Sequence, residues 1–193
     1  MQLWVGLGNP EPSQARHRHN IGFMALDSLA RRHGFAPWRQ RFKGLVADGA
    51  VGGERVLALK PMTYMNGSGD SVRPALAFHK LSPGNVWVFH DELDLAPGRV
   101  RVKRGGGAAG HNGLRDIQRA LGTPDFWRVR LGIGHPGHKD RVTGHVLGNF
   151  AKGDGPWLER LLDAVADAAP LLAARKPEDF MTRVALLAQE DAR

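Results

Sequence analysis

Four short segments of the chain have the hydrophobic pattern of β-strands. Residues 3–7 and 86–89 are apolar in a continuous run, which is typical of central strands that are covered on both faces. Residues 99–103 and 127–131 instead alternate between apolar and basic side chains, with the period of two expected of half-exposed strands. The pattern therefore predicts both buried central strands and half-exposed ones.

Two further strands are expected in a hairpin. Gly52-Gly53 favours a tight turn that joins residues 45–51 to residues 55–60. Pro61 is expected to end the second strand, because proline has no N–H to donate to a sheet.

Mostly apolar side chains, with one histidine among them, recur at helical spacing in four other segments. These stripes comprise Ile21, Met24, Leu26 and Leu29; Val72, Leu76 and His79; Leu114, Ile117 and Leu121; and Leu158, Leu161, Leu162, Val165, Leu171 and Leu172. Gly34 and Gly122 are expected to end the first and third helices, and Asn112 is the expected N-cap of the third. Residues 180–187 form a further candidate helix, and residues 134–144 are expected to be a loop.

Strands that alternate with helices predict an α/β fold with a mixed, largely parallel central sheet flanked by helices. No internal repeat or linker interrupts the pattern. We therefore expect one domain over residues 1–193, with C-terminal helices from about residue 156. No apolar run approaches the ~18 residues of a membrane span, and the first residues lack the basic start of a signal peptide.

The charge balance points toward phosphate-rich partners. The 193 residues include 27 Lys and Arg against 19 Asp and Glu, a net charge of +8. Such an excess favours nucleic acid, because neutralising phosphates releases condensed counterions. A basic, solvated surface without such a partner is an equally good interpretation of charge alone.

The absence of cysteine narrows the chemistry. It excludes disulfides, thiolate metal sites and a cysteine nucleophile. It also fits a cytoplasmic protein. With five serines and no complete G-x-S-x-G, a covalent serine nucleophile is not expected either. Any hydrolysis is expected to use an activated water instead.

Two other motifs fit known cofactor sites poorly. Residues 105–110 (GGGAAG) satisfy G-x-G-x-x-G, but the preceding strand is basic and no acidic residue follows at the dinucleotide spacing. Two interpretations of residues 105–110 remain. The segment is either a glycine loop that offers N–H groups to an anion or a flexible connection between a strand and a helix. The loop histidines match no standard zinc signature and are expected to be solvated. They are His135, His138 and His145, beside Asp140.

One histidine and one aspartate form a sharper candidate pair. His19 directly precedes a predicted helix, and Asp91 follows the apolar strand at residues 86–89. Open α/β sheets bind ligands at the carboxyl ends of their strands. A carboxylate that orients an imidazole is a standard means of activating water. No other residue is expected to be placed as a base beside Asp91, although a helix cap and a turn cap would also explain the pair.

Six stretches in order resemble the bacterial-type peptidyl-tRNA hydrolase family. They are VGLGNP at 5–10, RHNIG at 18–22, KPMTYMNGSG at 60–69, HDELDL at 90–95, GGG at 105–107 with GHNGL at 110–114, and RLGIGHPG at 130–137. Together they span almost the whole chain, and the part after Asn149 matches in helical character only. The resemblance implies a single α/β domain that hydrolyses the ester between a peptide and the 3′ ribose of tRNA, without a metal or other cofactor.

The resemblance also implies roles for individual residues. His19 matches the general base and Asp91 its orienting carboxylate. The matches to substrate-binding residues are Asn9, Asn66, Asn112 and Tyr64, and the matches to tRNA-phosphate contacts are Lys103 and Arg130. Neutral amides suit a substrate-indifferent hydrolase because they bind peptide N–H and C=O groups of any sequence.

The sequence departs from the family pattern soon after Asn9. Glu11-Pro12-Ser13 intervenes where a glycine is usual, and Gln14 stands at an aromatic position. Gln14 is therefore the candidate substrate contact there. The segment also offers His17, but the Arg-His-Asn order selects His19.

The period of two places basic residues together on two strands. Arg101 and Lys103 share a face, as do Arg128 and Arg130. We expect them to form a basic shelf beside Asn112, unless they are simply solvated charges.

We therefore expect a monomeric, cytoplasmic peptidyl-tRNA esterase. A non-catalytic RNA-binding protein on the same scaffold is the alternative from another class, and a nicotinamide oxidoreductase is the third.

Overall fold

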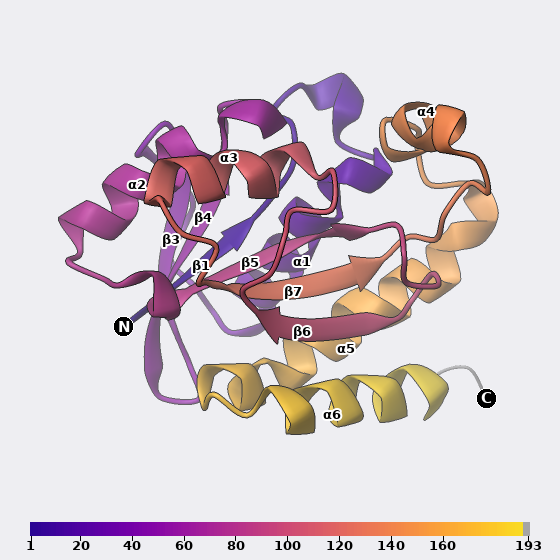
Figure 1. The fold of residues 1–193 in the computed structure, drawn as a ribbon. Helices are drawn as coiled ribbons and strands as arrows, with labels where there is room; N and C mark the ends of the chain where they lie inside the picture. The colour runs from indigo at the N-terminus through magenta and orange to yellow at the C-terminus, as the bar shows by residue number, and fades with distance from the viewer. Residues whose placement is uncertain (191–193) are drawn as a thin grey trace.

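A seven-stranded mixed sheet runs through the centre of the molecule in this computed structural model, which describes residues 1–190 (Figure 1). Its strand order is β2-β3-β4-β1-β5-β7-β6. The strands are β1 (Gln2–Gly6), β2 (Arg39–Arg41), β3 (Gly44–Val51), β4 (Glu54–Pro61), β5 (Val86–Glu92), β6 (Val100–Arg104) and β7 (Trp127–Gly132).

The centre of the sheet is parallel and its edges are antiparallel. Strands β4, β1, β5 and β7 pair in parallel, whereas β2 and β3 on one side and β6 on the other run antiparallel to their neighbours. The predicted α/β class with a mixed, largely parallel sheet is thus confirmed. Because the four central strands point the same way, their carboxyl ends meet at one edge, where such sheets bind ligands.

Helices cover both faces of the sheet. The helices are α1 (Ile21–Arg32), α2 (Gly69–Phe78), α3 (Asn112–Leu121), α4 (Val142–Val146), α5 (Gly155–Ala173) and α6 (Pro177–Glu190). One core packs α1, α5 and α6 against the sheet, and a second packs α2 and α3 against the opposite face. The C-terminal helices begin close to the expected position, and residues 191–193 of the expected domain lie outside the described residues.

Alternate side chains of the central strands enter the two cores. Trp4 and Phe89 pack on the α1 side, whereas Leu3, Val5 and Val88 pack on the α2 side. All five are fully buried. Burial on both faces is why these strands are continuously apolar, and each such side chain contributes about 1.5–3 kcal/mol.

The predicted hairpin is present, but part of the predicted loop is helical. Strands β3 and β4 pair up to Val51 and Glu54, and Gly52 and Gly53 have φ angles of +57° and +83° in the turn. Residues 134–144 were expected to be a loop, yet they include a 3-10 turn at Lys139–Arg141 and the start of α4. A five-residue helix is too short to show an apolar period. Within residues 1–190, none of the helices combines the length and apolarity that a membrane crossing requires.

Candidate active site

A cavity of about 890 Å³ opens at the carboxyl edge of the sheet. It is lined by residues from β5, the glycine-rich segment before α3, and α4, together with His19 and the segment before α2. The position agrees with the expectation drawn from the ends of the apolar strands.

Two glycines allow His19 to come close to the end of β5. A Cβ on Gly22, in the first turn of α1, would lie 2.3 Å from the Phe89 carbonyl oxygen, and one on Gly6 would lie 2.4 Å from the Gly22 carbonyl oxygen. The start of α1 can therefore lie directly on β1 and β5. His19 sits in the 3-10 turn Arg18–Asn20 just before α1 and so faces Asp91.

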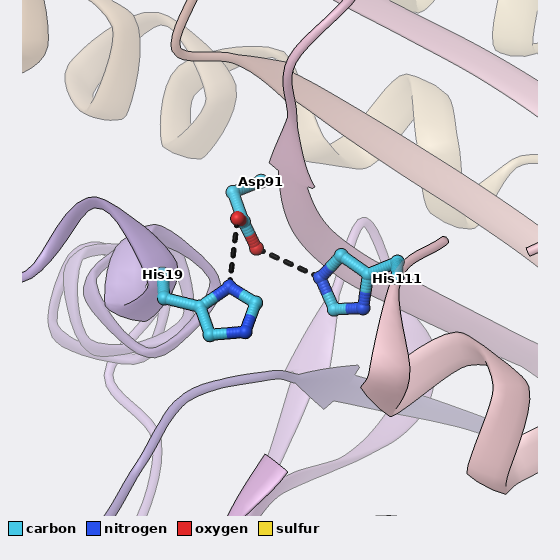
Figure 2. A group of neighbouring side chains, drawn as sticks. All are labelled: His19, Asp91 and His111. Atoms are coloured by element: carbon cyan, nitrogen blue, oxygen red, sulfur yellow. Dashed lines mark hydrogen bonds and ion pairs between the residues drawn. The ribbon is translucent and has the colours of Figure 1, made fainter. Parts of the chain in front are cut away.

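Asp91 receives hydrogen bonds from two histidines, not one (Figure 2). His19 Nδ1 lies 2.7 Å from Asp91 Oδ2, and His111 Nε2 lies 2.8 Å from Asp91 Oδ1. Asp91 and His19 are 3% and 8% exposed, so water screens the group weakly. The predicted pair is brought together, and His111 is a second histidine beside Asp91 that the sequence did not indicate.

The hydrogen-bond partners determine the imidazole tautomers. His111 Nδ1 accepts the N–H groups of Gly113 and Leu114, so its proton must be on Nε2, which donates to Asp91. The carboxylate can only accept, so His19 Nδ1 also donates to it. His19 Nε2 is then left with a lone pair, as a general base requires.

The same contacts correct the predicted N-cap. His111, rather than Asn112, caps α3, and Asn112 is the first residue of the helix. Asparagine is the commoner cap, so the sequence favoured it. The imidazole of His111 instead caps the helix with one nitrogen and holds Asp91 with the other.

Burial and the two imidazoles act in opposite directions on Asp91. Burial, the largest single influence, would raise the pKa of its carboxyl group, but His111 and His19 outweigh it and hold the pKa well below its usual range. Asp91 is therefore an anion at neutral pH, able to stabilise an imidazolium at His19.

His90 is not an alternative base. Burial, with His111 nearby, lowers the pKa of His90 to about 3. Its Nδ1 donates to the Asp91 carbonyl oxygen, and its Nε2 is buried with no partner among the described residues. Because both nitrogens of His111 are occupied and burial disfavours protonation of His90, His19 is the best placed of these three histidines to act as a base.

His19, Asp91 and His111 are also close enough to surround a metal ion, since their ligand atoms lie within 4.8 Å of one another. His111 opposes this use, because its Nε2 keeps a proton while Nδ1 caps α3. The loop histidines are not gathered into such a group. His145 Nε2 bonds to the Gly134 carbonyl oxygen, and His135 Nδ1 accepts the Gly137 N–H.

Asn20 links the His19 turn to the rest of the cavity. Its carboxamide accepts the Asn9 N–H and donates to the Asn9 carbonyl oxygen, both at 2.9 Å. The Asn9 Oδ1 in turn accepts the Met65 N–H at 2.8 Å. This chain of amides fixes the turn that carries Asn66, a role for Asn20 that its place in the sequence did not indicate.

Most of the predicted substrate-binding residues line the cavity, but Gln14 does not. The lining includes Asn9, Tyr64, Asn66, Asn112, Lys103 and Arg130. Gln14 lies on the 3-10 turn Pro12–Gln14, and its Oε1 is buried with no partner among the described residues. Tyr64 is 49% exposed and donates its hydroxyl hydrogen to Glu11, one of the residues in the unusual segment.

The basic shelf differs from the expectation at two positions. Arg101 pairs with Arg130 and Lys103 with Arg128 across β6 and β7, so the four do share a face. Arg128, however, is completely buried beneath the glycine-rich loop, and Arg130 is paired with Glu92 at 2.8 Å. The period of two in the sequence indicates which sheet face carries the basic residues, but it does not indicate that the glycine-rich loop covers Arg128.

Comparisons with known proteins agree on one family. The family model for peptidyl-tRNA hydrolase matches residues 3–192. Peptidyl-tRNA hydrolases of Acidiphilium cryptum and Granulibacter bethesdensis are 73% and 72% identical, covering 100% and 96% of this chain and 100% and 95% of their own. A crystal structure of peptidyl-tRNA hydrolase from Acinetobacter baumannii has a TM-score of 0.89 at 41% identity, covering 95% of this chain and 94% of its own.

Proposed function

The chain belongs to the peptidyl-tRNA hydrolase family and is a hydrolase of ester bonds, and we propose that His19 is its general base. The substrate is a peptide or N-blocked aminoacyl group esterified to the 3′ end of tRNA. The observation that supports this mechanism best is the 2.7 Å contact between His19 Nδ1 and Asp91 Oδ2, which favours the tautomer with its proton on Nδ1 and leaves Nε2 to act as the base.

In this mechanism His19 Nε2 takes a proton from water as the oxygen attacks the ester carbonyl carbon. Asp91 stabilises the imidazolium that forms and keeps the ring in place. Collapse of the tetrahedral intermediate breaks the bond to the ribose 3′ oxygen, and the imidazolium returns the proton to that oxygen. The products are free tRNA and the peptide acid.

Two amide side chains are free to bind the peptide. Asn66 and Asn112 line the cavity and are exposed, and their side-chain amides make no hydrogen bond with any other residue in the described range. Asn9 contributes mainly by fixing the Met65 turn. Tyr64, half-exposed at the cavity, offers an aromatic face to the terminal adenosine or to a peptide side chain.

The decisive experiment is turnover of an N-blocked aminoacyl-tRNA by the purified protein. We expect many turnovers per enzyme, with equal amounts of free tRNA and blocked amino acid. His19→Ala purified in the same way controls for contaminating hydrolases. Tight binding of tRNA without ester cleavage would favour the non-catalytic RNA-binding alternative.

His111 is proposed to position Asp91, and its variants should separate two effects. His111→Ala should cost about 1 kcal/mol of stability through the lost helix cap. It should also slow turnover by about tenfold, less than loss of the base would. His111→Ser can still cap α3 but has no nitrogen to reach Asp91, so it should recover stability without recovering turnover. Thermal unfolding and steady-state rates of both variants test this, and a fully active His111→Ser would refute the positioning role.

Lys103 and Arg130 are proposed to bind tRNA phosphates. Lys103→Ala should weaken binding of whole peptidyl-tRNA and flatten the plot of log affinity against log salt by roughly one unit or less. Arg130→Ala should have a smaller effect, because Glu92 already neutralises this guanidinium. Neither should change hydrolysis of a minimal ester of the terminal nucleoside. Lys176→Ala, an exposed lysine between α5 and α6, is the control, and equal losses on both substrates would contradict the phosphate role.

We propose that the protein acts as a monomer in the cytoplasm, where translation produces its substrate. Light scattering at the assay concentration should give a mass near 21.1 kDa.

A further inference from the structure

The glycine-rich loop between β6 and α3 presents a run of free backbone donors. The Gly105 N–H bonds to the Phe126 carbonyl oxygen, and the His111 N–H bonds to the Ala108 carbonyl oxygen. Between them, the N–H groups of residues 106–110 have no protein acceptor within the described part of the chain. Ala109 has φ +49°, a left-handed conformation that is costly for a residue with a side chain. Such loops form concave sites for anions.

Two side chains hold the loop by its carbonyl oxygens. Arg128 Nη1 donates to the Gly107 oxygen at 2.6 Å, and Gln118 Nε2 donates to the Gly106 oxygen at 3.2 Å. In a trans peptide unit the N–H points opposite to the C=O. The Ala108 and Gly107 N–H groups are therefore directed away from these anchors. Because Arg128 and Gln118 polarise the same peptide units through their carbonyl oxygens, these N–H groups become stronger donors to an anion.

The Arg128 guanidinium, which lies beneath the loop, has no carboxylate partner in the part of the chain whose side chains are described. Arg128 is fully buried, its Nη2 donates to the Pro124 carbonyl oxygen, and its Nε has no acceptor among the described residues. Its hydrogen-bond partners are carbonyl oxygens, and it forms no ion pair with any residue from 1 to 189. Buried arginines are normally paired with a carboxylate. Burial, followed by the nearby Arg130, lowers the pKa of Arg128, but a guanidinium remains charged at neutral pH.

A second cation stands beside the same loop. Lys103 lies directly opposite Arg128 in the sheet and is exposed. A Cβ on Gly106 would be 2.9 Å from Lys103 Nζ, so this amine is adjacent to the loop. Glu92 neutralises Arg130, so Lys103 and Arg128 are the cations of β6 and β7 that line the cavity without a carboxylate partner among the described residues.

We propose that the loop Gly105–Gly110 binds a phosphate group through its own backbone N–H groups, with Arg128 and Gln118 fixing the loop and Lys103 closing the site. The loop lines the cavity that contains His19, so the phosphate is one of the tRNA 3′ strand next to the terminal nucleoside. This assignment rests on the proposed function. It adds a backbone site to the side-chain contacts of Lys103 and Arg130.

The first test measures phosphate binding without turnover, so it stands even if the proposed reaction fails. Potassium phosphate is titrated into glycine-labelled protein and compared with potassium chloride at equal ionic strength. The amide resonances of Gly106, Gly107 and Gly110 should shift together and saturate. Gly106→Ala forces a side chain at φ +97° and should weaken binding by about tenfold. Gly53→Ala, with φ +83° and open space around it, is matched for strain and should bind normally.

Gln118→Ala is the second variant, in case Gly106→Ala is poorly folded. It removes the hydrogen bond by which α3 holds the Gly106 carbonyl oxygen, and it should also weaken phosphate binding. Loop resonances that do not respond to phosphate, or that respond equally in the folded Gly106→Ala variant, would overturn the proposal.

The second test distinguishes a substrate phosphate from free phosphate. Inorganic phosphate should compete with whole peptidyl-tRNA and with an N-blocked aminoacyl ester of a CCA trinucleotide. It should not affect hydrolysis of the corresponding adenosine ester, which has no phosphate. Phosphate that binds the loop but competes with neither of the first two substrates would overturn the assignment to tRNA.

Discussion

Replacing His19 with alanine should reduce turnover by about 10²–10⁴-fold, the usual cost of losing a general base. The reason is that neither neighbouring histidine can replace it. His111 uses both of its nitrogens, and burial lowers the pKa of His90 to about 3. Single-turnover rates on N-blocked aminoacyl-tRNA measure the loss directly.

Binding and folding should be almost unchanged in His19→Ala. The proposed tRNA contacts, Lys103 and Arg130, lie on other parts of the cavity, and the turn at Arg18–Asn20 is held by Asn20. His17→Ala is the matched control, because His17 lies two residues away and pairs through its backbone with Asn149. A His19→Ala variant with more than about a tenth of the wild-type rate would remove His19 from the mechanism.

Asp91→Asn should be nearly as damaging, for a reason specific to this site. Two imidazole N–H groups face the carboxylate, but an amide offers only one oxygen. His111 cannot change tautomer, because its Nδ1 caps α3. The amide oxygen must therefore face His111, and the NH₂ group faces His19. His19 Nδ1 then accepts, its proton moves to Nε2, and the base is lost, as the roughly 10⁴-fold effect of such a change in a serine protease illustrates.

Removing the His111 imidazole should restore part of the turnover rate that Asp91→Asn loses. In the double variant Asp91→Asn with His111→Ser, the amide is free to turn its oxygen toward His19, so part of the lost rate should return. The acidic limb of the pH–rate profile should move to lower pH in either variant, because no carboxylate stabilises the imidazolium. A double variant no faster than Asp91→Asn alone would contradict the tautomer argument.

The central strands and the main helices could be predicted from the sequence because burial imposes a strong pattern. The run at residues 86–89 is apolar on both faces, and both faces are in fact covered. Segments without such a pattern were missed. Strand β2 has three polar residues, and α4 has five residues, too few for a stripe.

In the site, the sequence indicated which residues meet but not how they are bonded. His19 and Asp91 were predicted from their places at element ends, and the contact is present at 2.7 Å. His111 was overlooked because the neighbouring Asn112 is a residue type that commonly caps helices, so the sequence favoured Asn112 as the N-cap of α3. The burial of Arg128 depends on the path of the glycine-rich loop, which no local pattern encodes.

The most direct test of the catalytic account is the protonation of individual histidine nitrogens by nitrogen NMR of the native protein at neutral pH. We predict that His19 carries its proton on Nδ1 with Nε2 free, that His111 has the opposite arrangement, and that His19 alone changes in Asp91→Asn. A neutral His19 with its proton on Nε2 in the wild-type protein would leave no base at this nitrogen and would contradict the mechanism.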